Sequence, residues 1–430
     1  MLQALTSGAQ PATKISAGSQ SLFLKCDGSL WAMGDNLEGQ LGDGTYSNTN
    51  QPEQIVTNGV TAIAAGGMHS LFLKSDGSLW AMGWDYYGQL GDGTFNTTNR
   101  PEQIVNSNVM AIAAGGFFSL FLKKDGSLWA MGYNNHGQLG EGTSDNGTYK
   151  TNRPEQIVFS NVTAIAAGAY HSLFLKNDSS LWGMGESTFG QLGSAGGSSP
   201  GQIVSSNVTA IAAGVVHSLF LKSDGSLWAM GDNQFGELGD GTHNLMTNQP
   251  EQIVASNVTA ISAGSYHSLF LKSDGSLWAI GDNEFGQLGD GTFNTTNRPE
   301  QVVSSNVTAI AAGGYYSLFL KNDGSLWGMG TNFFGQLGDG TFNKTNRPEQ
   351  IVAGTPGFNQ ICCQLMGCTN MQLSFVGIAN ANYALDRSSS LSPPDWIPQA
   401  TNPAGSFGAL LFTNPPDATT NNFWRIRSVP

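Results

Sequence analysis

A unit of about 50 residues recurs seven times along this chain and constrains its fold more than any other feature. The stretch HSLFLKSDGSLWAMG occurs at residues 69–83 and again, letter for letter, at 217–231. One tryptophan marks each copy, at intervals of 46 to 53 residues: Trp31, Trp80, Trp129, Trp182, Trp228, Trp278 and Trp327. A repeat of this length is one supersecondary unit that buries its apolar faces only against neighbouring copies.

Each repeat predicts short β-strands and no helix. Its apolar segments PEQIV, VTAIAAG, HSLFLK and SLWAMG are bounded by Gly, Asn or Asp, which is the strand signature. The Asp-Gly pair between SLFLK and SLWAMG predicts a tight hairpin with a type I′ turn, in which both central residues have positive φ. The fourth repeat has Asp178-Ser179 there, so we expect slight strain in that turn.

The strands are apolar at successive positions, as in Leu71, Phe72 and Leu73, which indicates sheets covered on both faces. Antiparallel sheets that cover one another form a β-propeller. The sequence therefore predicts an all-β, seven-bladed β-propeller over residues 1–352. Because the first repeat lacks a preceding PEQIV segment, we expect Pro348–Val352 to pair beside Lys14–Gly18 and fasten the ring.

The composition changes after Val352. Residues 353–369 are predicted to be a linker that carries Cys362, Cys363 and Cys368, and a disulfide from Cys368 to one of the adjacent pair, such as Cys362, is sterically conceivable. A zinc site is disfavoured because a fourth ligand is lacking. Residues 370–430 are predicted to form a small β-sandwich-like module, with strands in LSFVGI, YALDRS, FGALLFT and FWRIRS.

Hairpin geometry predicts where function lies. The two residues before HSL and the four after SLWAMG sit at the open end of one hairpin, so both loops should meet on one face of the ring. These loops differ most between repeats and are rich in aromatic residues, which are typical of protein interfaces. The predicted partner-binding residues are Trp84, Tyr86, Tyr87, Phe117, Tyr133, His136, Tyr170, Tyr266, Tyr315 and Phe333. The alternative is that the regularly placed Phe189, Phe235, Phe285 and Phe334 only fill gaps between blades.

Other recurring polar residues are interpreted as structural. His69, His171, His217 and His267 share one repeat position with Phe118 and Tyr316, which favours packing or a loop hydrogen bond over metal binding. The aspartates of GDGT favour Asx turns over calcium, and the Asn of N-V-T favours a turn over glycosylation. We find no motif that isolates a catalytic set, so a non-catalytic protein without cofactor or metal is expected.

The net charge of −13, with only 11% charged residues, argues against nucleic-acid binding. No run of about 18 apolar residues is present, so no membrane span is expected. The first fourteen residues lack the pattern of a signal peptide. A monomer is expected.

The unit VTAIAAG-x-x-HSLFLK-x-DG-SLWAMG-x-N-x-x-GQLGDGT resembles the repeat of the regulator-of-chromosome-condensation (RCC1-like) propellers, over about residues 12–352. The resemblance implies a seven-bladed ring and raises guanine-nucleotide exchange on a small GTPase as an alternative function, although this acidic chain has no basic arm. VTAIAAG and HSL also resemble bacterial propellers that inhibit β-lactamases, so inhibition of a secreted hydrolase is a further alternative. Glycan binding by exposed Trp and Tyr is another. The C-terminal module resembles those of secreted environmental bacterial proteins, which implies a bacterial-type member that is extracellular or at the cell surface.

Overall fold

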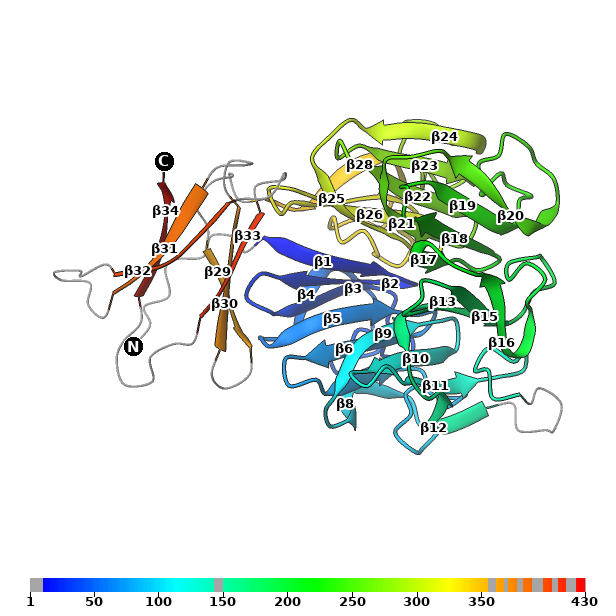
Figure 1. The fold of residues 1–430 in the computed structure, drawn as a ribbon, viewed down its shortest axis with the longest axis horizontal. Coiled ribbons are helices and arrows are strands. Elements are labelled where there is room, and N and C mark those ends of the chain that lie inside the picture. The colour runs from blue at the N-terminus through cyan, green and yellow to red at the C-terminus, as the bar shows by residue number, and fades with distance from the viewer. Residues whose placement is uncertain are drawn as a thin grey trace.

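Seven four-stranded antiparallel sheets follow one another around a ring in the computed structural model (Figure 1). The structure describes residues 11–142 and 150–354, together with the backbone of six strands in the C-terminal part. Each of the seven sheets of the ring consists of four strands that are consecutive in the chain. The described residues contain no helix. The prediction of an all-β, seven-bladed propeller is confirmed.

The strand bounds repeat from blade to blade. Blades 1 to 4 consist of β1 (Ala12–Ala17), β2 (Gln20–Lys25), β3 (Leu30–Gly34), β4 (Thr49–Val56); β5 (Val60–Ala65), β6 (His69–Lys74), β7 (Leu79–Gly83), β8 (Thr98–Val105); β9 (Val109–Ala114), β10 (Phe118–Lys123), β11 (Leu128–Tyr133), β12 (Lys150–Val158); and β13 (Val162–Ala167), β14 (His171–Lys176), β15 (Leu181–Gly185), β16 (Gly197–Val204). Blades 5 to 7 consist of β17 (Val208–Ala213), β18 (His217–Lys222), β19 (Leu227–Asp232), β20 (Met246–Val254); β21 (Val258–Ala263), β22 (His267–Lys272), β23 (Leu277–Gly281), β24 (Thr296–Val303); and β25 (Val307–Ala312), β26 (Tyr316–Lys321), β27 (Leu326–Gly330), β28 (Thr345–Val352).

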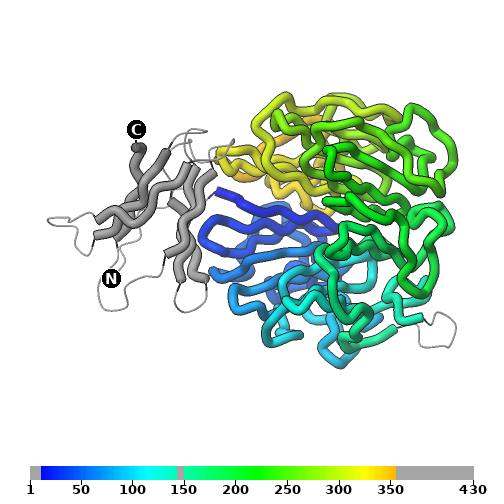
Figure 2. The backbone as a smooth tube through the Cα atoms, in the orientation of Figure 1, coloured from blue at the N-terminus to red at the C-terminus, as the bar shows by residue number. Residues whose placement is uncertain are grey.

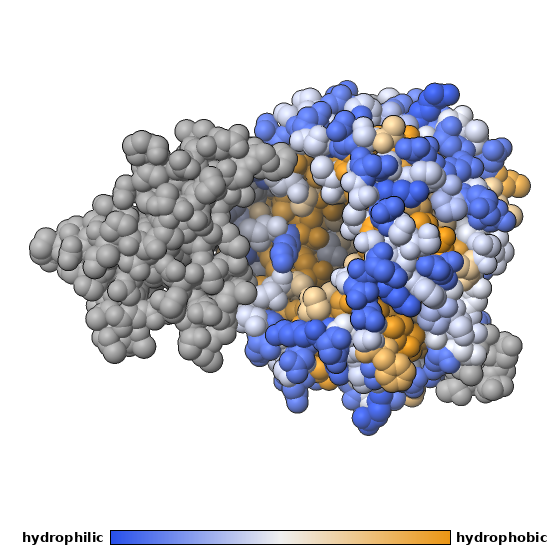
Figure 3. All heavy atoms as spheres, in the orientation of Figure 1, coloured by the Kyte–Doolittle hydropathy of each residue, from blue (hydrophilic) through white to orange (hydrophobic). Residues whose placement is uncertain are grey.

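The VTAIAA strand is the innermost strand of every blade. The Ala-Gly pairs that end these strands line a narrow central channel, and in Figure 3 the ring is hollowed at its middle. Around this channel each blade donates a backbone N–H to the next, as from Gly67 to the carbonyl of Gly115 at 3.1 Å. The last of these bonds runs from Gly314 in blade 7 to Gly18 in blade 1 at 3.3 Å, so the circle is closed.

The second strand of each blade is apolar on both faces because a neighbouring blade covers each face. Phe72 packs against blade 1 with Leu22 and Leu24, whereas Leu71 and Leu73 pack against blade 3 with Phe121. These side chains are 0–3% exposed. The prediction from successive apolar residues is confirmed.

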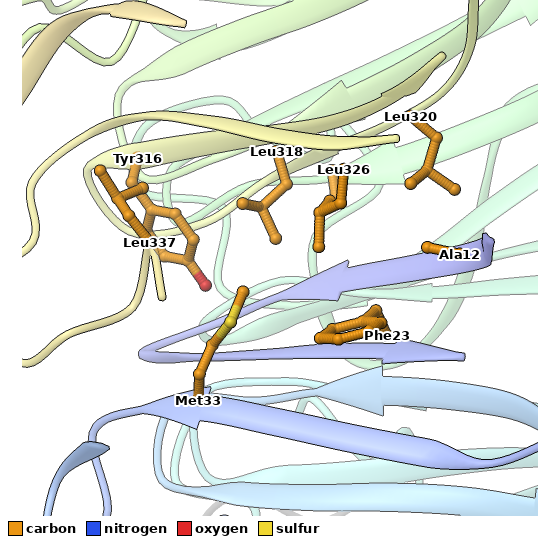
Figure 4. Close-up of a cluster of buried hydrophobic side chains, with 9 residues drawn as sticks. Ala12, Phe23, Met33, Tyr316, Leu318, Leu320, Leu326 and Leu337 are labelled. Carbon is orange, nitrogen blue, oxygen red and sulfur yellow. The ribbon is translucent and has the colours of Figure 1, made fainter. Parts of the chain in front are cut away.

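Blades 1 and 7 close the ring through the same kind of core. Phe23 and Met33 of blade 1 pack against Tyr316, Leu318 and Leu326 of blade 7 (Figure 4). The first described strand, β1, drawn in blue, lies beside the yellow strands of blade 7 (Figure 2). Residues about 300 positions apart therefore form one continuous buried seam.

The predicted closure by Pro348–Val352 is wrong. These residues belong to β28, which pairs with β27 of its own blade, with Trp327 opposite Gln350. Strand β1 pairs only with β2 among the described strands. The physical reason is that each PEQIV segment folds back onto the SLW strand that precedes it. Blade 1 thus has its own outer strand, β4, and the seam needs side-chain packing but no exchanged strand.

The Asp-Gly hairpins also differ from the prediction. Gly28 has a φ of 76°, whereas Asp27 is not among the residues with positive φ. The N–H of Gly28 donates to the carbonyl of Lys25 and the N–H of Lys25 to that of Ser29, which defines a three-residue loop. Such a loop is a type I turn followed by one left-handed residue, so only Gly needs a positive φ. The type I′ prediction is wrong.

Blade 4 places Ser179 in that left-handed position, with a φ of 62°. A side chain raises the energy of this conformation, whereas glycine adopts it freely. We expect Ser179→Gly to raise the free energy of unfolding by about 0.5–1 kcal/mol, measured by urea denaturation. The reverse change, Gly225→Ser in blade 5, should lower it by a similar amount. Equal stabilities for Ser179→Gly and the parent would contradict the expected strain.

The asparagines of N-V-T are turn residues, as predicted. Asn161, Asn207, Asn257 and Asn306 all have φ between 67° and 69°, on the turn that leads from the outer strand of one blade to the inner strand of the next. Gly59 has the same conformation in blade 2, with a φ of 78°.

The six described strands of the C-terminal part form two three-stranded sheets. One is formed by β29 (Ile361–Met366), β30 (Asn370–Val376) and β33 (Ala409–Asn414), and the other by β31 (Asn382–Ser388), β32 (Ile397–Pro403) and β34 (Phe423–Val429). Residues 353–369 are predicted to be a linker, but part of this stretch is strand β29, which contains Cys362 and Cys363. It is a strand because ICCQLM pairs with β30. Cys368 and the proposed disulfide lie outside the described residues.

Candidate functional site

Both variable loops of each repeat meet on one face of the ring. The N–H of Trp84, just after β7, donates to the carbonyl of Met68, just before β6, at 2.9 Å. The same bond joins Tyr133 to Phe117 in blade 3 and Asp282 to Tyr266 in blade 6. The prediction from hairpin geometry is confirmed, and all ten predicted face residues lie in these loops or at the ends of the adjoining strands.

Seven of them form one continuous cluster across blades 2, 3 and 4. Trp84 and Phe117 have ring centroids 5.3 Å apart, Tyr87 and Tyr133 4.5 Å, and His136 and Tyr170 4.8 Å. The blade 2–4 aromatic cluster comprises Trp84, Tyr86, Tyr87, Phe117, Tyr133, His136 and Tyr170. Because these rings come from three blades, their contact depends on the packing of the blades.

The blade 2–4 aromatic cluster is half-open to solvent. Tyr86 is 57% exposed, and Trp84, Phe117 and Tyr133 are half-buried. Lys150 lies over the ring of Tyr86 at 4.5 Å and donates to its backbone carbonyl at 2.8 Å. Such a surface combines large apolar area with polar tips, which suits a wet protein interface.

One polar contact joins the cluster to blade 4, where Nδ1 of His136 contacts the Glu186 carboxylate. Burial alone would raise the pKa of Glu186, but hydrogen bonds from Thr188 and the nearby His136 lower it overall. The imidazole is thus held in place against Tyr170.

The other three predicted residues lie in a second group on blades 5 to 7. Tyr266 contacts Phe235 of blade 5 at 5.1 Å and Tyr315 of blade 7 at 6.1 Å, and Phe285 lies 6.0 Å from Phe333. The blade 5–7 aromatic cluster comprises Phe235, Tyr266, Phe285, Tyr315 and Phe333. The structure thus divides the predicted face into two aromatic areas.

The regularly placed phenylalanines do not all behave alike. Phe235 and Phe285 are half-buried against the tyrosine of the following blade, as expected for residues that fill gaps between blades. Phe189 and Phe334 are 41% and 40% exposed. Their regular spacing therefore does not by itself determine burial.

The four repeated histidines hold neighbouring blades together beneath this face. Each is fully buried, and its Nε2 lies 2.8–3.0 Å from a serine hydroxyl of the next blade: His69 to Ser119, His171 to Ser218, His217 to Ser268 and His267 to Ser317. Since each serine donates its own proton to a backbone carbonyl, as Ser119 does to Gln89, the imidazole must be the donor. The prediction of a structural hydrogen bond is confirmed.

Burial lowers the pKa of these histidines far below the usual value, to about 3 for His69, His171 and His267 and about 4 for His217. The neutral Nε2–H form is therefore the native one near neutral pH. Nδ1 of each ring has no hydrogen-bond partner, so no acceptor is present to stabilise a second proton.

The GDGT aspartates form Asx turns, as predicted. Oδ1 of Asp43 accepts from the N–H of Thr45 at 2.7 Å, and the same bond recurs in the loops of Asp92, Asp240, Asp290 and Asp339. Within residues 11–142 and 150–354, no three His, Cys, Asp or Glu side chains are placed to share a metal ion.

Two buried carboxyl groups were not singled out by sequence reasoning. Asp85 occupies the repeat position of Asn36, whose side-chain amide donates to Asp43 in blade 1 at 3.1 Å. An aspartate carboxylate has no proton to donate in this way, and Oδ2 of Asp85 lacks a hydrogen-bond partner. Burial and, secondarily, the nearby Asp92 raise the pKa of Asp85 to about 7. Glu237 likewise replaces a repeated glutamine, and burial and the nearby Asp232 raise its pKa to about 7. Both departures from the repeat are visible in the sequence.

Sequence reasoning also missed a set of exposed rings in the GDGT loops. Their solvent exposure ranges from 44% to 50%, and the set comprises Tyr46, Phe95, Phe293 and Phe342. The recurrence of an aromatic residue directly after GDGT was the available signal.

These features define the chain as a closed seven-bladed propeller with two aromatic areas on one loop face. The model of the RCC1-like domain matches residues 98–376, and the chain belongs to this family. Regulator of chromosome condensation (RCC1) repeats match residues 27–73 and 60–89. No curated protein matches the sequence. No described helix has the length and apolar character to cross a membrane.

Solved structures with the same fold include human WBSCR16, with a TM-score of 0.69 and 22% identity over 77% of this chain and 95% of that chain. Yeast RCC1 (Prp20) bound to Kap60 has a TM-score of 0.69 and 21% identity over 84% of this chain and 91% of that one. Prp20p from Saccharomyces cerevisiae, described with its binding to Gsp1p and histones, has a TM-score of 0.68 and 21% identity over 82% of this chain and 90% of that chain. At these identities the likeness shows the fold alone.

Proposed function

We propose that this protein is a non-catalytic recognition propeller that binds a partner protein through the blade 2–4 aromatic cluster. The observation that carries the proposal is the contact of seven rings from three blades on one loop face, with Tyr86 more than half exposed. The equivalent loop of blade 1 has Asp35, Asn36, Leu37 and Glu38. The aromatic content of this loop is therefore not a requirement of the repeat, and the blade 2–4 aromatic cluster is the larger of the two aromatic areas.

The chemistry of the cluster supports protein binding. Large aromatic side chains contribute contact area at a low cost in conformational entropy, and Tyr and Trp dominate interface hot spots. Their mutual contacts restrict them before a partner arrives, which reduces the cost of ordering. The acidic chain favours a protein over a nucleic acid as the partner.

Two alternatives concern the identity of the partner. Prp20p, of the same fold, is described with binding to Gsp1p and histones, which keeps guanine-nucleotide exchange on a small GTPase as one alternative. Inhibition of a secreted hydrolase is the other. Both use a protein-binding face, so the identity of the partner separates them.

The test compares a double variant with a matched control. A partner is captured by cross-linking from the cells or medium of the source organism, identified, and purified for affinity measurements. We expect Trp84→Ala with Tyr86→Ala to raise the Kd at least about 30-fold, since a single hot-spot residue contributes about 2 kcal/mol or more and the contributions of neighbours do not simply add. Leu37→Ala, at the position of Tyr86 in blade 1 and 59% exposed, should change the Kd less than about two-fold.

Unchanged affinity of the double variant would overturn the proposal, provided that its melting temperature stays within a few degrees of the parent. Accelerated nucleotide release from a captured GTPase would assign the exchange function, and loss of activity of a captured hydrolase would assign inhibition.

A further inference from the structure

A polar groove lies between blades 6 and 7, where the GDGT loop of blade 6 faces the outer strand of blade 7. Its volume is about 740 Å³, within the range of about 300–1,000 Å³ typical of small-molecule sites. The walls are the GDGT loop of blade 6, the outer strand β24 and the start of β28 in blade 7. Lining side chains include Asp290, Thr292, Asn294, Glu300 and Arg347.

Opposite charges face this groove without neutralising each other. The only Lys, Arg or His within 4 Å of a carboxylate in the described part of the chain is His136, so Arg347 is unpaired with Asp290 and Glu300. No hydrogen bond of the Arg347 guanidinium is observed among those residues. The guanidinium donor of Arg347 and the acceptor carboxylates of Asp290 and Glu300 therefore line the same groove.

The position of Arg347 is specified by the neighbouring blade. Its Nη2 would lie 2.9 Å from a Cβ added to Gly291, so the guanidinium lies directly on the backbone of the GDGT loop. A side chain at residue 291 would displace it. The second glycine of GDGT thus makes room for the arginine of the next blade.

The same arrangement recurs at three other junctions between blades. Arg100 lies over Gly44, Arg153 over Gly93 and Arg298 over Gly241, with the nearest guanidinium atoms 2.6–3.0 Å from a built Cβ. Each junction also has the GDGT aspartate and the PEQ glutamate in its sequence, in the pairs Asp43 and Glu53, Asp92 and Glu102, and Asp240 and Glu251. Sister junctions have Gln51, Gln249 or Ser199 in place of the arginine.

This combination of groups selects one class of ligand. An ion of either sign would meet at least one group of like charge, and an apolar ligand would leave charged groups desolvated. A hydroxyl group both donates and accepts, so neighbouring hydroxyls of a sugar can donate to Glu300 while accepting from Arg347. Phe293, 46% exposed between Thr292 and Asn294, lies at the same loop with Nζ of Lys344 4.6 Å from its ring centroid, so an aromatic ring and a further hydrogen-bond donor stand beside the groove.

We propose that the groove at Arg347 and its three counterparts at Arg100, Arg153 and Arg298 bind neutral glycans. None of these four arginines belongs to the blade 2–4 aromatic cluster of the proposed function, and none is among the exposed Trp and Tyr considered above for sugar binding. Four sites on one rim suit a polysaccharide with repeated units, because linked sites bind with greater avidity than one alone. The rim visible in Figure 3 is mainly polar, which agrees with a hydroxyl-rich ligand.

The test uses the full chain and a panel of immobilised neutral polysaccharides: a β-glucan, an α-glucan, a mannan and a galactan. We expect retention on at least one of them, and at least a ten-fold loss of apparent affinity in the variant Arg100→Gln, Arg153→Gln, Arg298→Gln, Arg347→Gln. Glutamine is the residue that two sister junctions already have, and all four arginines are exposed, so the melting temperature should not change.

Other outcomes would overturn the glycan proposal. These are no retention on any neutral polysaccharide, equal retention of the quadruple variant and the parent, or retention only on a sulfated polysaccharide that salt abolishes. Trp84→Ala with Tyr86→Ala should leave glycan retention unchanged, and the quadruple variant should bind the protein partner normally. The failure of one proposal is thereby distinguishable from the failure of the other.

Discussion

Acidification from pH 7 to about 4.5 is expected to lower the free energy of unfolding by roughly 5 kcal/mol. The four buried histidines are the main cause. Their folded-state pKa values of about 3 to 4 lie below the ordinary value of 6.5, so the unfolded chain binds protons that the folded chain refuses. Stability is therefore fully present above about pH 6.5 and is lost as the pH falls.

Two carboxyl groups oppose this trend. The pKa values of Asp85 and Glu237 are raised to about 7 in the folded chain. As the pH falls below about 7, these two groups are protonated in the folded chain before they are protonated in the unfolded chain, and this raises the free energy of unfolding. Each histidine lowers the free energy of unfolding by about 1.4 kcal/mol for each pH unit below 6.5. The two carboxyl groups offset about half of the combined effect of the four histidines. The net slope is about 3 kcal/mol per unit between pH 6 and 4.5.

Urea denaturation at a series of pH values measures this slope. Replacing all four histidines with phenylalanine, the residue that blade 3 has as Phe118, should abolish or reverse it, at some cost in stability at pH 7 from the lost hydrogen bonds. Parallel slopes for the variant and the parent would mean that other groups cause the acid sensitivity.

Tyr316→Ala is expected to destabilise the ring by about 4–5 kcal/mol. Tyr316 is 1% exposed in the core between blades 7 and 1. Its hydroxyl donates to the backbone carbonyl of Gln20 at 2.8 Å and lies 2.8 Å from the hydroxyl oxygen of Ser21, which itself donates to the carbonyl of Gln336 at 2.6 Å. The change leaves a cavity in the seam and two polar groups of blade 1 with fewer partners.

Thermal and urea unfolding of matched variants measures this effect. Tyr316→Phe removes only the hydroxyl and should cost about 1–2 kcal/mol. Phe118→Ala makes a comparable cavity between blades 3 and 4, where the chain itself also joins the blades. We expect Tyr316→Ala to increase proteolysis at both ends of the ring more than Phe118→Ala does. Stability of Tyr316→Ala within 1 kcal/mol of the parent would contradict a packed seam.

The repeat alone predicted the strands, their number and the both-sided burial of segments such as Leu71–Leu73, because these depend on local pattern and on contact between identical units. It did not predict the seam. Counting PEQIV segments could not decide whether Pro348–Val352 pairs with the first strand of blade 1 or with the preceding strand of blade 7. Both pairings use every strand once and give seven sheets of four strands. Backward pairing occurs because β27 is nearest along the chain, and the blade 1 edge is covered by packing instead.

The loop face was predictable because antiparallel pairing places both variable loops together whatever their sequence. Which rings touch was not, since contacts such as Tyr87 with Tyr133 depend on the angle between blades. Asp85 and the unpaired arginines such as Arg347 were missed for a similar reason. Their significance lies in what surrounds them, and those neighbours come from another strand or another blade.

The central claim is that whole-repeat blades close into a ring, so that the junction between blades 7 and 1 is equivalent to every other junction. At this junction the N–H of Gly340 donates to the carbonyl of Asn50 at 2.8 Å, as Gly44 does to Asn99 between blades 1 and 2. Spin labels on the exposed residues Thr341 and Gln51 should therefore give the same single, short distance as labels on Thr45 and Arg100. A longer or broad distribution for the first pair, with a short distance for the second, would show an open chain of blades and contradict the account.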